Sequence, residues 1–471
     1  MKMSKFALTA MVASACFAGT AFGQSNRTAP RYYPASYYSY YQDGVQAPVA
    51  SASDAKAAAC CDKKSACDVA DICNGKGGKG GSCDSMGSCG CGNSACDGGC
   101  GGGCGSGGCG SGCGGGLLGL GLLGGGGKLG DPWKLAPNGI AGVTVGGWST
   151  LGYHTAKENF NFNNYDSKVQ LQQQWLYAEK TADGSNGIGF GGRLDYLYGT
   201  DGPDTQSFGI PNRHWDNSWD NGGAYGHAMP QAYGEAAVGD LSVKVGHFFT
   251  IVGNEVVQAT GNFFYSRQFT FYNAIPFTHT GALSTYKLDA DTQLYNGYVM
   301  GWDSGYENNG NAYIGGFKRT INDKSSLIYT TVIGEFGKTV GEKGSINDIV
   351  YTNNVTEKLT FISQTSVLQT SNSASTSQRN TFGNINYLIY KISDRVALGQ
   401  RFEWFNYGGA AFNGRHNDDL MNHTVGINYK VNSNVMLRPE VRWIWDRQRF
   451  GFLENNNSSQ AIFGMDSVMT F

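Results

Sequence analysis

The feature that most constrains the fold is a long series of segments in which apolar and polar residues alternate. About sixteen such segments follow one another from residue 140 to the C-terminus, and a period of two is typical of β-strands with two different faces. Most of them reach the roughly 9–11 residues that a tilted strand needs to cross a bilayer, whereas ordinary strands average roughly 5–6 residues. The expected strands are 141–153, 168–181, 187–199, 230–238, 241–250, 280–288, 292–302, 311–319, 325–335, 346–354, 357–369, 379–391, 395–406, 419–431, 434–446 and 460–471.

The connections between these segments alternate in length. Tight turns such as Gly239-Asp240 and Ser393-Asp394 alternate with long polar stretches such as 200–229 and 251–279. Short periplasmic turns and longer outer loops are the rule for bacterial outer-membrane barrels, and a soluble sandwich has no need of them. The sequence therefore predicts an all-β transmembrane antiparallel β-barrel of about 16 strands, within a range of about 14–18.

Charged residues fall on the row opposite to the apolar one. In 395–406, Leu398 and Phe402 share one row, and Arg401 and Glu403 share the other. Because Arg or Lys facing lipid at mid-bilayer costs ~2–4 kcal/mol, the charged row is expected to face a polar lumen. These residues either tune the pore or pair with one another in interior salt bridges. The candidate pore-lining residues are Arg193, Asp195, Arg401, Glu403, Arg438, Glu440 and Arg442.

One long connection is unusually aromatic. Residues 251–279 contain many Phe and Tyr residues, and so much aromatic surface would not stay in water. The segment either folds inward as a constriction loop or packs on the rim or on a neighbouring subunit. The constriction-loop candidates are Phe263, Phe264, Phe277 and His279.

The last strand carries a separate signal. Phe463, Met465, Met469 and the terminal Phe471 share one face. An alternating last strand that ends in an aromatic residue resembles the recognition signal of outer-membrane barrels for their assembly machinery. We assign Phe471 as this assembly signal.

The chain before the barrel divides into three zones. Residues 1–23 have a basic start, an apolar stretch and a small-residue cleavage site, which predicts a signal peptide; Cys16 leaves a lipoprotein signal as the alternative. Residues 24–59 form a Tyr/Ala-rich flexible segment and residues 60–130 a Cys/Gly-rich low-complexity segment. The barrel is assigned to residues 138–471.

The Cys-rich segment holds twelve of the 13 cysteines. An even number of cysteines in an exported chain is typical of disulfide pairing, and the surrounding Gly and Ser cannot build a core. A disulfide-rich tether or cross-linking segment, a disordered spacer with incidental pairing and a metal-binding segment remain open, although the spacing is not that of a zinc ribbon and no His is present. The disulfide candidates are Cys60, Cys61, Cys67, Cys73, Cys83, Cys89, Cys91, Cys96, Cys100, Cys104, Cys109 and Cys113.

The composition excludes several classes of function. A formal net charge of -2 gives no reason to expect nucleic acid as a partner. The chain has no uninterrupted apolar run of roughly 18 residues that would predict a transmembrane helix. None of the 7 His residues lies in a catalytic motif. We expect no enzyme activity, no cofactor and no metal site in the barrel.

Two stretches resemble signature segments of a known family. Residues 245–257, with Val245-Gly246-His247-Phe248-Phe249, and residues 276–281, with Pro276-Phe277-Thr278-His279-Thr280-Gly281, are similar to the OmpL-like β-barrel porins, known as beta-barrel porin-2. The resemblance covers roughly residues 140–471 and leaves the Cys-rich segment outside. It implies an outer-membrane channel, and sixteen-stranded porins suggest a homotrimer by analogy.

These observations predict an outer-membrane porin with its N-terminal segment in the periplasm. Its channel would pass small hydrophilic solutes by passive diffusion, and its partners would be outer-membrane lipids, those solutes and further copies of the chain. The alternative is an envelope-anchoring or structural surface protein. In that case the barrel is only a membrane anchor and the cysteines form cross-links to the envelope.

Overall fold

The computed structural model describes residues 129–471, apart from 208–214, 222, 307–309 and 338–340. The signal peptide, the Tyr/Ala-rich segment and all the candidate disulfide cysteines lie outside the described residues. The barrel domain is described almost completely.

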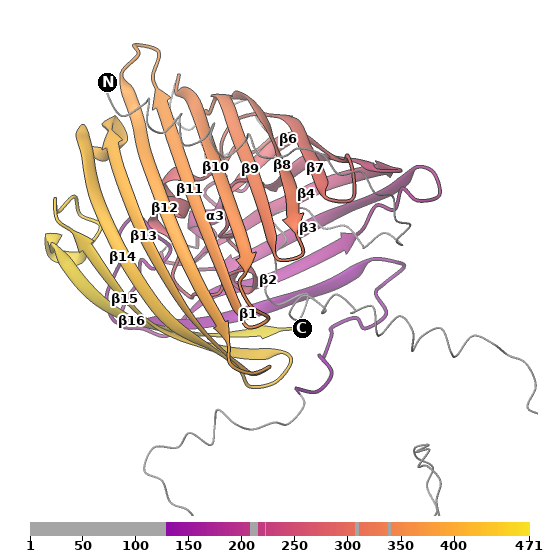
Figure 1. Cartoon of the computed structure of the whole chain (residues 1–471), viewed down its shortest axis with the longest axis horizontal. Helices are drawn as coiled ribbons and strands as arrows, with labels where there is room; N and C mark the ends of the chain where they lie inside the picture. The colour runs from indigo at the N-terminus through magenta and orange to yellow at the C-terminus, as the bar shows by residue number, and fades with distance from the viewer. Residues whose placement is uncertain (1–128, 208–214, 222, 307–309, 338–340) are drawn as a thin grey trace, which may run out of the picture.

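Sixteen antiparallel strands close into one barrel in which each strand pairs with its neighbours in sequence (Figure 1). The ring closes where β1 pairs with β16, from Trp148 opposite Thr470 to His154 opposite Gly464. The predicted all-β transmembrane barrel of about 16 strands is confirmed. The strands are β1 (Thr144–His154), β2 (Gln170–Lys180), β3 (Gly189–Gly199), β4 (Gly226–Val238), β5 (Leu241–Phe249), β6 (Thr278–Lys287), β7 (Thr292–Val299), β8 (Asn311–Asn322), β9 (Ser325–Glu335), β10 (Lys343–Asn354), β11 (Leu359–Ser371), β12 (Ser377–Lys391), β13 (Val396–Gly409), β14 (Arg415–Lys430), β15 (Val435–Asp446) and β16 (Ser459–Thr470).

Long loops and short turns lie at opposite ends of the barrel. Every second connection, such as the one between β4 and β5, is a short turn, and the long connections carry the short helices. The helices are α3 (Gly202–Thr205), η3 (Ala259–Gly261), α4 (Phe269–Ala274), η4 (Ala410–Phe412) and η5 (Glu454–Asn456). Among the described residues, no helix is long and apolar enough to span a membrane.

Several strands extend further toward the loops than the apolar pattern predicts. β14 begins at Arg415 rather than at residue 419, because its polar first residues still pair with β13, with Asp418 opposite Tyr407. β4 begins at Gly226, and a register shift between Asp195 and Leu197 of β3 interrupts the alternation at that level. Backbone pairing therefore continues where the alternation of side chains fails.

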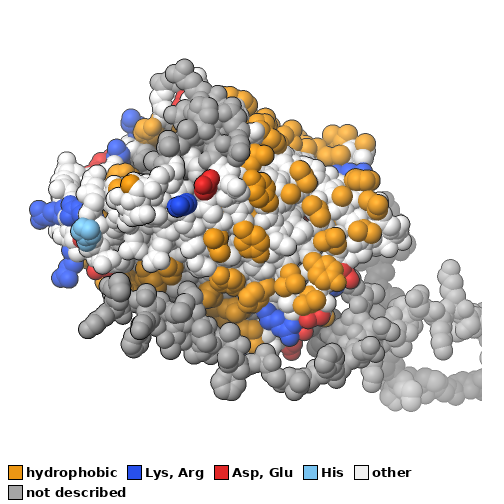
Figure 2. Space-filling view, turned by 90° about the horizontal axis from the view of Figure 1, so that it is seen from above, with side chains coloured by type: hydrophobic (Ala, Val, Ile, Leu, Met, Phe, Trp, Pro, Cys, Tyr) orange, Lys and Arg blue, Asp and Glu red, His pale blue; other side chains and the backbone are white. Residues whose placement is uncertain are grey.

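The two rows of each strand face different surroundings. On β13, Leu398 and Phe402 are 40% and 42% exposed on the outer wall, whereas Arg401 and Glu403 are fully buried on the inner side. Figure 2 shows apolar side chains spread over the outer wall with few charges among them. Because lipid tolerates apolar side chains and rejects charges, this outer wall suits a bilayer.

The chain just before β1 lies against the short-turn end of the barrel. The amide of Asn434, in the turn between β14 and β15, donates to the Trp133 carbonyl at 2.8 Å and accepts from the Trp133 backbone N–H at 2.7 Å. The Trp133 ring lies 6.3 Å from the ring of Phe471. Phe471 itself exchanges two backbone hydrogen bonds of 2.9 Å with Gly147 of β1. Its role in assembly stays a prediction.

Candidate functional site

The longest aromatic connection lies inside the barrel. Residues 250–277, between β5 and β6, contain η3 and α4, and their backbone and side-chain groups form hydrogen bonds with inward-facing residues of β11, β13 and β15. We call this segment the lumen loop. Most of its residues are buried, including Phe263, Phe264 and Phe269. The structure thus favours the inward-folded interpretation of this segment over packing on the rim.

Two inward-facing carboxylates hold the backbone of the lumen loop. Glu403 of β13 accepts hydrogen bonds from the backbone N–H groups of Phe269, at 3.0 Å, and Thr270, at 2.7 Å. Glu440 of β15 accepts from Tyr265 at 2.9 Å and Ser266 at 3.2 Å. Phe269 and Thr270 begin α4, where the first N–H groups of a helix have no partner within the helix. A carboxylate satisfies them with strong, charge-assisted bonds.

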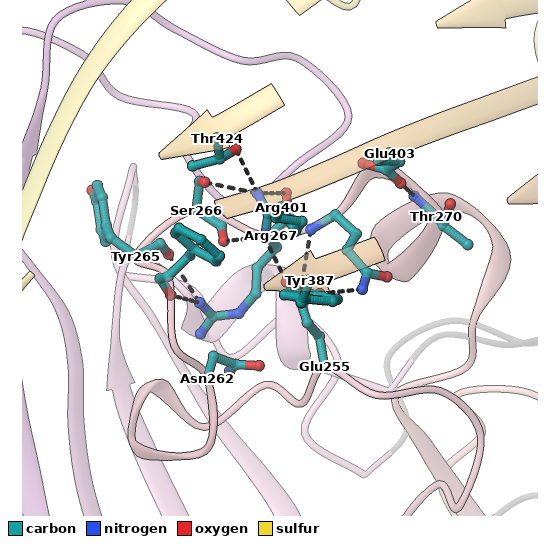
Figure 3. Close-up of polar contacts among 12 residues, drawn as sticks. Glu255, Asn262, Tyr265, Ser266, Arg267, Thr270, Tyr387, Arg401, Glu403 and Thr424 are labelled. Carbon is teal, nitrogen blue, oxygen red and sulfur yellow. Dashed lines mark hydrogen bonds and ion pairs between the residues drawn. The ribbon is translucent and has the colours of Figure 1, made fainter. Parts of the chain in front are cut away.

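Two inward-facing arginines hold the carbonyl groups of the same loop, and Figure 3 shows the contacts of one of them, Arg401. Arg401 Nη1 donates to the Ser266 carbonyl at 2.9 Å and pairs with the Glu255 carboxylate at 2.5 Å. Arg438 Nη1 donates to the carbonyls of Ala259 and Asn262, both at 2.8 Å. Because the guanidinium group has five donors in a fixed plane, one arginine can satisfy several loop acceptors at once. The wall and the loop therefore form one polar network.

A second loop joins this network. Glu158, between β1 and β2, pairs with Arg442 Nη1 of β15 at 2.6 Å, and both side chains are 1% exposed. The Arg442 guanidinium also lies 4.6 Å from the centre of the Phe269 ring in the lumen loop. Arg442 thus connects two inward-folded loops to one strand.

Glycines on the inner wall make room for the side chains of the lumen loop. A Cβ atom at Gly399 of β13 would lie 2.3 Å from the Phe263 ring, and one at Gly426 of β14 would lie 3.3 Å from the Phe264 ring. A Cβ at Gly464 of β16 would lie 2.9 Å from the Tyr265 ring. Each of these aromatic side chains therefore lies over a position where the wall has no side chain.

Filling one of these positions should displace the lumen loop. We expect Gly399→Ala to destabilise the barrel by about 1–3 kcal/mol, the usual cost of overpacking, and to move Phe263 away from the wall. Gly234→Ala on β4 is the matched control, because nothing lies within 4 Å of a Cβ there. Urea unfolding in lipid vesicles measures both variants. Equal stability of the two variants would contradict the seating of Phe263 on Gly399.

The remaining two pore-lining candidates form a separate cluster on another part of the wall. Arg193 Nε pairs with Asp195 at 2.6 Å, and Arg193 Nη1 pairs with Glu179 of β2 at 3.0 Å. Gln231 of β4 donates to the second oxygen of Asp195 at 3.0 Å. All seven pore-lining candidates face inward, and the structure gives each of them a structural partner. Whether they also shape the passage of solutes stays a prediction.

Three of the four constriction-loop candidates lie in the lumen loop, and the fourth lies on a strand. Phe263 and Phe264 pack against inner-wall residues of β12 and β13, including Tyr387. Phe277 stacks on Phe271 with 4.7 Å between the ring centres. His279 lies on β6 rather than in the loop, where its ring nitrogens are 2.8 Å from the Gly301 carbonyl and 3.1 Å from Thr250 Oγ1. Their constricting role stays a prediction.

Sequence reasoning missed several residues that hold the loop. Tyr387 donates to Glu255 at 2.8 Å, and Gln268 of the loop donates to Gln364 of β11 at 3.1 Å. The glycines at inward positions of β13, β14 and β16 were a readable signal, because glycine in a strand marks a close approach of another part of the chain. Among the described residues, no group of three or more His, Cys, Asp or Glu side chains could hold a metal ion.

A buried carboxyl group at the entrance of α3 makes stability depend on pH. Asp201, outside the strands, is 4% exposed and accepts from Gln173 Nε2 at 2.8 Å. Burial raises its pKa from 3.8 to about 7, against the attraction of Arg267. Between these two values the folded state binds the proton more tightly than the unfolded state, so this contribution to stability falls as pH rises from about 4 to about 7.

Asp201→Asn should remove this dependence. We expect the temperature at which folded, fast-migrating protein is lost on gels to fall less between about pH 5 and about pH 8 in the variant than in the wild type. An identical pH profile for the two proteins would contradict the raised pKa of Asp201.

Comparison with protein families shows which family this chain belongs to. Residues 142–471 match the family described as "Putative beta-barrel porin-2, OmpL-like". The chain belongs to this family. The match begins just before β1 and ends at the C-terminus, so it spans the whole barrel. This OmpL-like protein is therefore an outer-membrane β-barrel of the porin type.

Solved structures of other barrels are similar to this OmpL-like protein. The outer-membrane-expressed OmpT of Vibrio cholerae is 11% identical with a TM-score of 0.47, and the match covers 70% of this chain and 99% of that chain. A second structure of that OmpT, described as a trimer form, is 10% identical with the same TM-score and coverage of 70% and 99%. A mutant of the Rh. blastica porin is 13% identical with a TM-score of 0.46, covering 70% of this chain and 100% of that one. No curated protein matches the chain in sequence.

Proposed function

We propose that the barrel forms a water-filled channel for the passive diffusion of small hydrophilic solutes across the outer membrane, and that the lumen loop sets its width. The observation that supports this most is the position of residues 250–277 inside the barrel, where Glu403 and Glu440 hold their backbone. Sixteen strands enclose a space too wide for wall side chains alone to fill. A loop fixed across that space is a means of limiting the size of a passing solute.

We also propose that the N-terminal segment lies in the periplasm and that the chain forms a homo-oligomer. The short turns mark the periplasmic end by the general rule for such barrels, and Gly130 and Trp133 contact the turn between β14 and β15. This contact supports a periplasmic position for the Tyr/Ala-rich and Cys-rich segments. In this proposal the homo-oligomer has no catalytic activity.

Planar-bilayer recording tests the channel. The purified full chain, shown to be folded by heat-modifiable gel migration, is expected to give stable conductance steps. Repeated insertion of folded protein without steps would contradict the channel and favour the alternative, in which the barrel only anchors a cross-linked segment to the envelope. Enlarged, unstable steps from the Gly399→Ala variant would further support a loop that sets the width.

A further inference from the structure

One part of the outer wall carries polar side chains where lipid would be expected. The strand pairing and alternation place five polar residues of β10, β11 and β12 on the outward-facing row, close to the middle of each strand. We call them the polar outer patch. Its residues are Asn347, Ser363, Thr365, Asn384 and Asn386.

Apolar residues flank the polar outer patch along the strands. On β12, Phe382 lies on the loop side of the two asparagines, and Leu388 and Tyr390 lie on the turn side, all on the same row. The patch is therefore enclosed within the apolar band and does not belong to either headgroup region. The wall at β14 and β16 is more apolar. Val425, Phe463 and Met465 are 40–42% exposed on its outward rows, and the polar residues His423 and Ser467 occur there singly.

The hydrogen bonds within the patch leave amide groups unsatisfied. Asn386 Nδ2 donates to Asn384 Oδ1 at 2.8 Å, and Asn384 Nδ2 donates to Thr365 Oγ1 at 3.1 Å. Asn347 Oδ1 accepts from Tyr329 at 2.8 Å. Among the described residues, neither Asn386 Oδ1 nor Asn347 Nδ2 has a partner. Lipid tails offer no hydrogen bonds, so such groups are costly when they face hydrocarbon.

We propose that the polar outer patch is a contact surface for a second copy of this chain. Asparagine amides carry both a donor and an acceptor, so a patch of them is complementary to itself when two copies meet about a two-fold axis. Hydrogen bonds between Ser, Thr and Asn side chains are a usual means of association within membranes. The patch has no charge, which agrees with a partner that presents the same neutral surface. This inference rests on the homo-oligomer of the proposed function and names its contact surface. It does not depend on the channel, because a non-conducting barrel could associate in the same way.

Replacing the amides by leucine tests the contact. We expect the full-length wild-type protein to sediment in detergent with the mass of more than one chain, and the Asn384→Leu/Asn386→Leu variant to sediment as a monomer. Leucine suits lipid at least as well as asparagine does, so the variant should still fold, which heat-modifiable gel migration verifies. Asn296→Leu on β7 is the matched control, since Asn296 is an exposed outward amide that lies outside the polar outer patch, and its replacement should leave the mass unchanged.

Photo-crosslinking in intact outer membranes gives the second measurement. A benzoylphenylalanine side chain at position 347 should produce a covalent product of twice the chain's mass, and the same group at position 296 should not. A monomeric wild type would overturn the proposed homo-oligomer and the contact surface together. An oligomeric wild type with an unchanged mass in the leucine variant, or a product with a different protein at position 347, would overturn the contact surface alone.

Discussion

The Glu403→Ala/Glu440→Ala variant is expected to conduct at least about twofold more current per channel than the wild type, because pore width controls conductance. The two carboxylates accept backbone hydrogen bonds from Tyr265, Ser266 and Phe269, among others. Each buried N–H group left without an acceptor costs about 1–3 kcal/mol, so the lumen loop should leave its position while the paired strands persist. Planar-bilayer recording at fixed salt measures the change.

Glu235→Ala separates loop release from the loss of lumen charge. Glu235 is on the inward row of β4 and lies opposite Lys244 of β5 in the strand register. Among the described residues, it makes no hydrogen bond to the lumen loop. Its removal changes the net charge of the wall without freeing the loop, so its conductance should stay close to that of the wild type. Equal conductance of the double variant and the wild type would show that the loop does not limit the passage.

Arg401→Met is expected to be the most destabilising single change in the network. The Arg401 guanidinium is fully buried, and its loss leaves the buried Glu255 carboxylate without its 2.5 Å ion-pair partner. Removal of one partner of a buried pair costs about 3–5 kcal/mol, mainly because the other charge stays desolvated. Urea unfolding in lipid vesicles measures the free energy of unfolding.

A second substitution distinguishes an unpaired charge from lost packing. Arg401→Met/Glu255→Gln removes both charges, and the neutral amide in place of the Glu255 carboxylate would still accept from Tyr387, which donates to Glu255 at 2.8 Å in the wild type. The double variant should therefore recover most of the stability that the single variant loses. No recovery would mean that packing of the Arg401 side chain, and not its pairing with Glu255, stabilises this part of the barrel.

The barrel could be predicted from the sequence because the alternation of its side chains is visible within each strand. Each strand alternates between lipid and lumen, so the alternating rows of β13 and β15 were enough to predict that Arg401 and Arg438 point inward. The alternation failed where the strands leave the bilayer, as at Arg415, because no lipid selects the residues there. It also failed on the outward rows of β10 to β12, where the polar outer patch replaces apolar residues.

The candidate site could be predicted only in part. The aromatic content of residues 250–277 required a covered position, but it did not distinguish the lumen from the rim or from another subunit. The direction of the loop is determined by partners distant in sequence: Glu403 and Glu440 follow Thr270 by more than a hundred residues. The glycines at 399, 426 and 464 indicate a close approach of another part of the chain, but which residues approach them is visible only once the strands are placed side by side.

Hydrogen–deuterium exchange of the folded, full-length protein tests most directly whether the lumen loop is bound inside the barrel. The backbone N–H groups of Tyr265, Ser266, Phe269 and Thr270 donate to carboxylates, so peptides covering residues 262–272 should exchange as slowly as the strands, and quickly in the Glu403→Ala/Glu440→Ala variant. Exchange of these peptides in the wild type at the rate of an open surface loop would contradict the account.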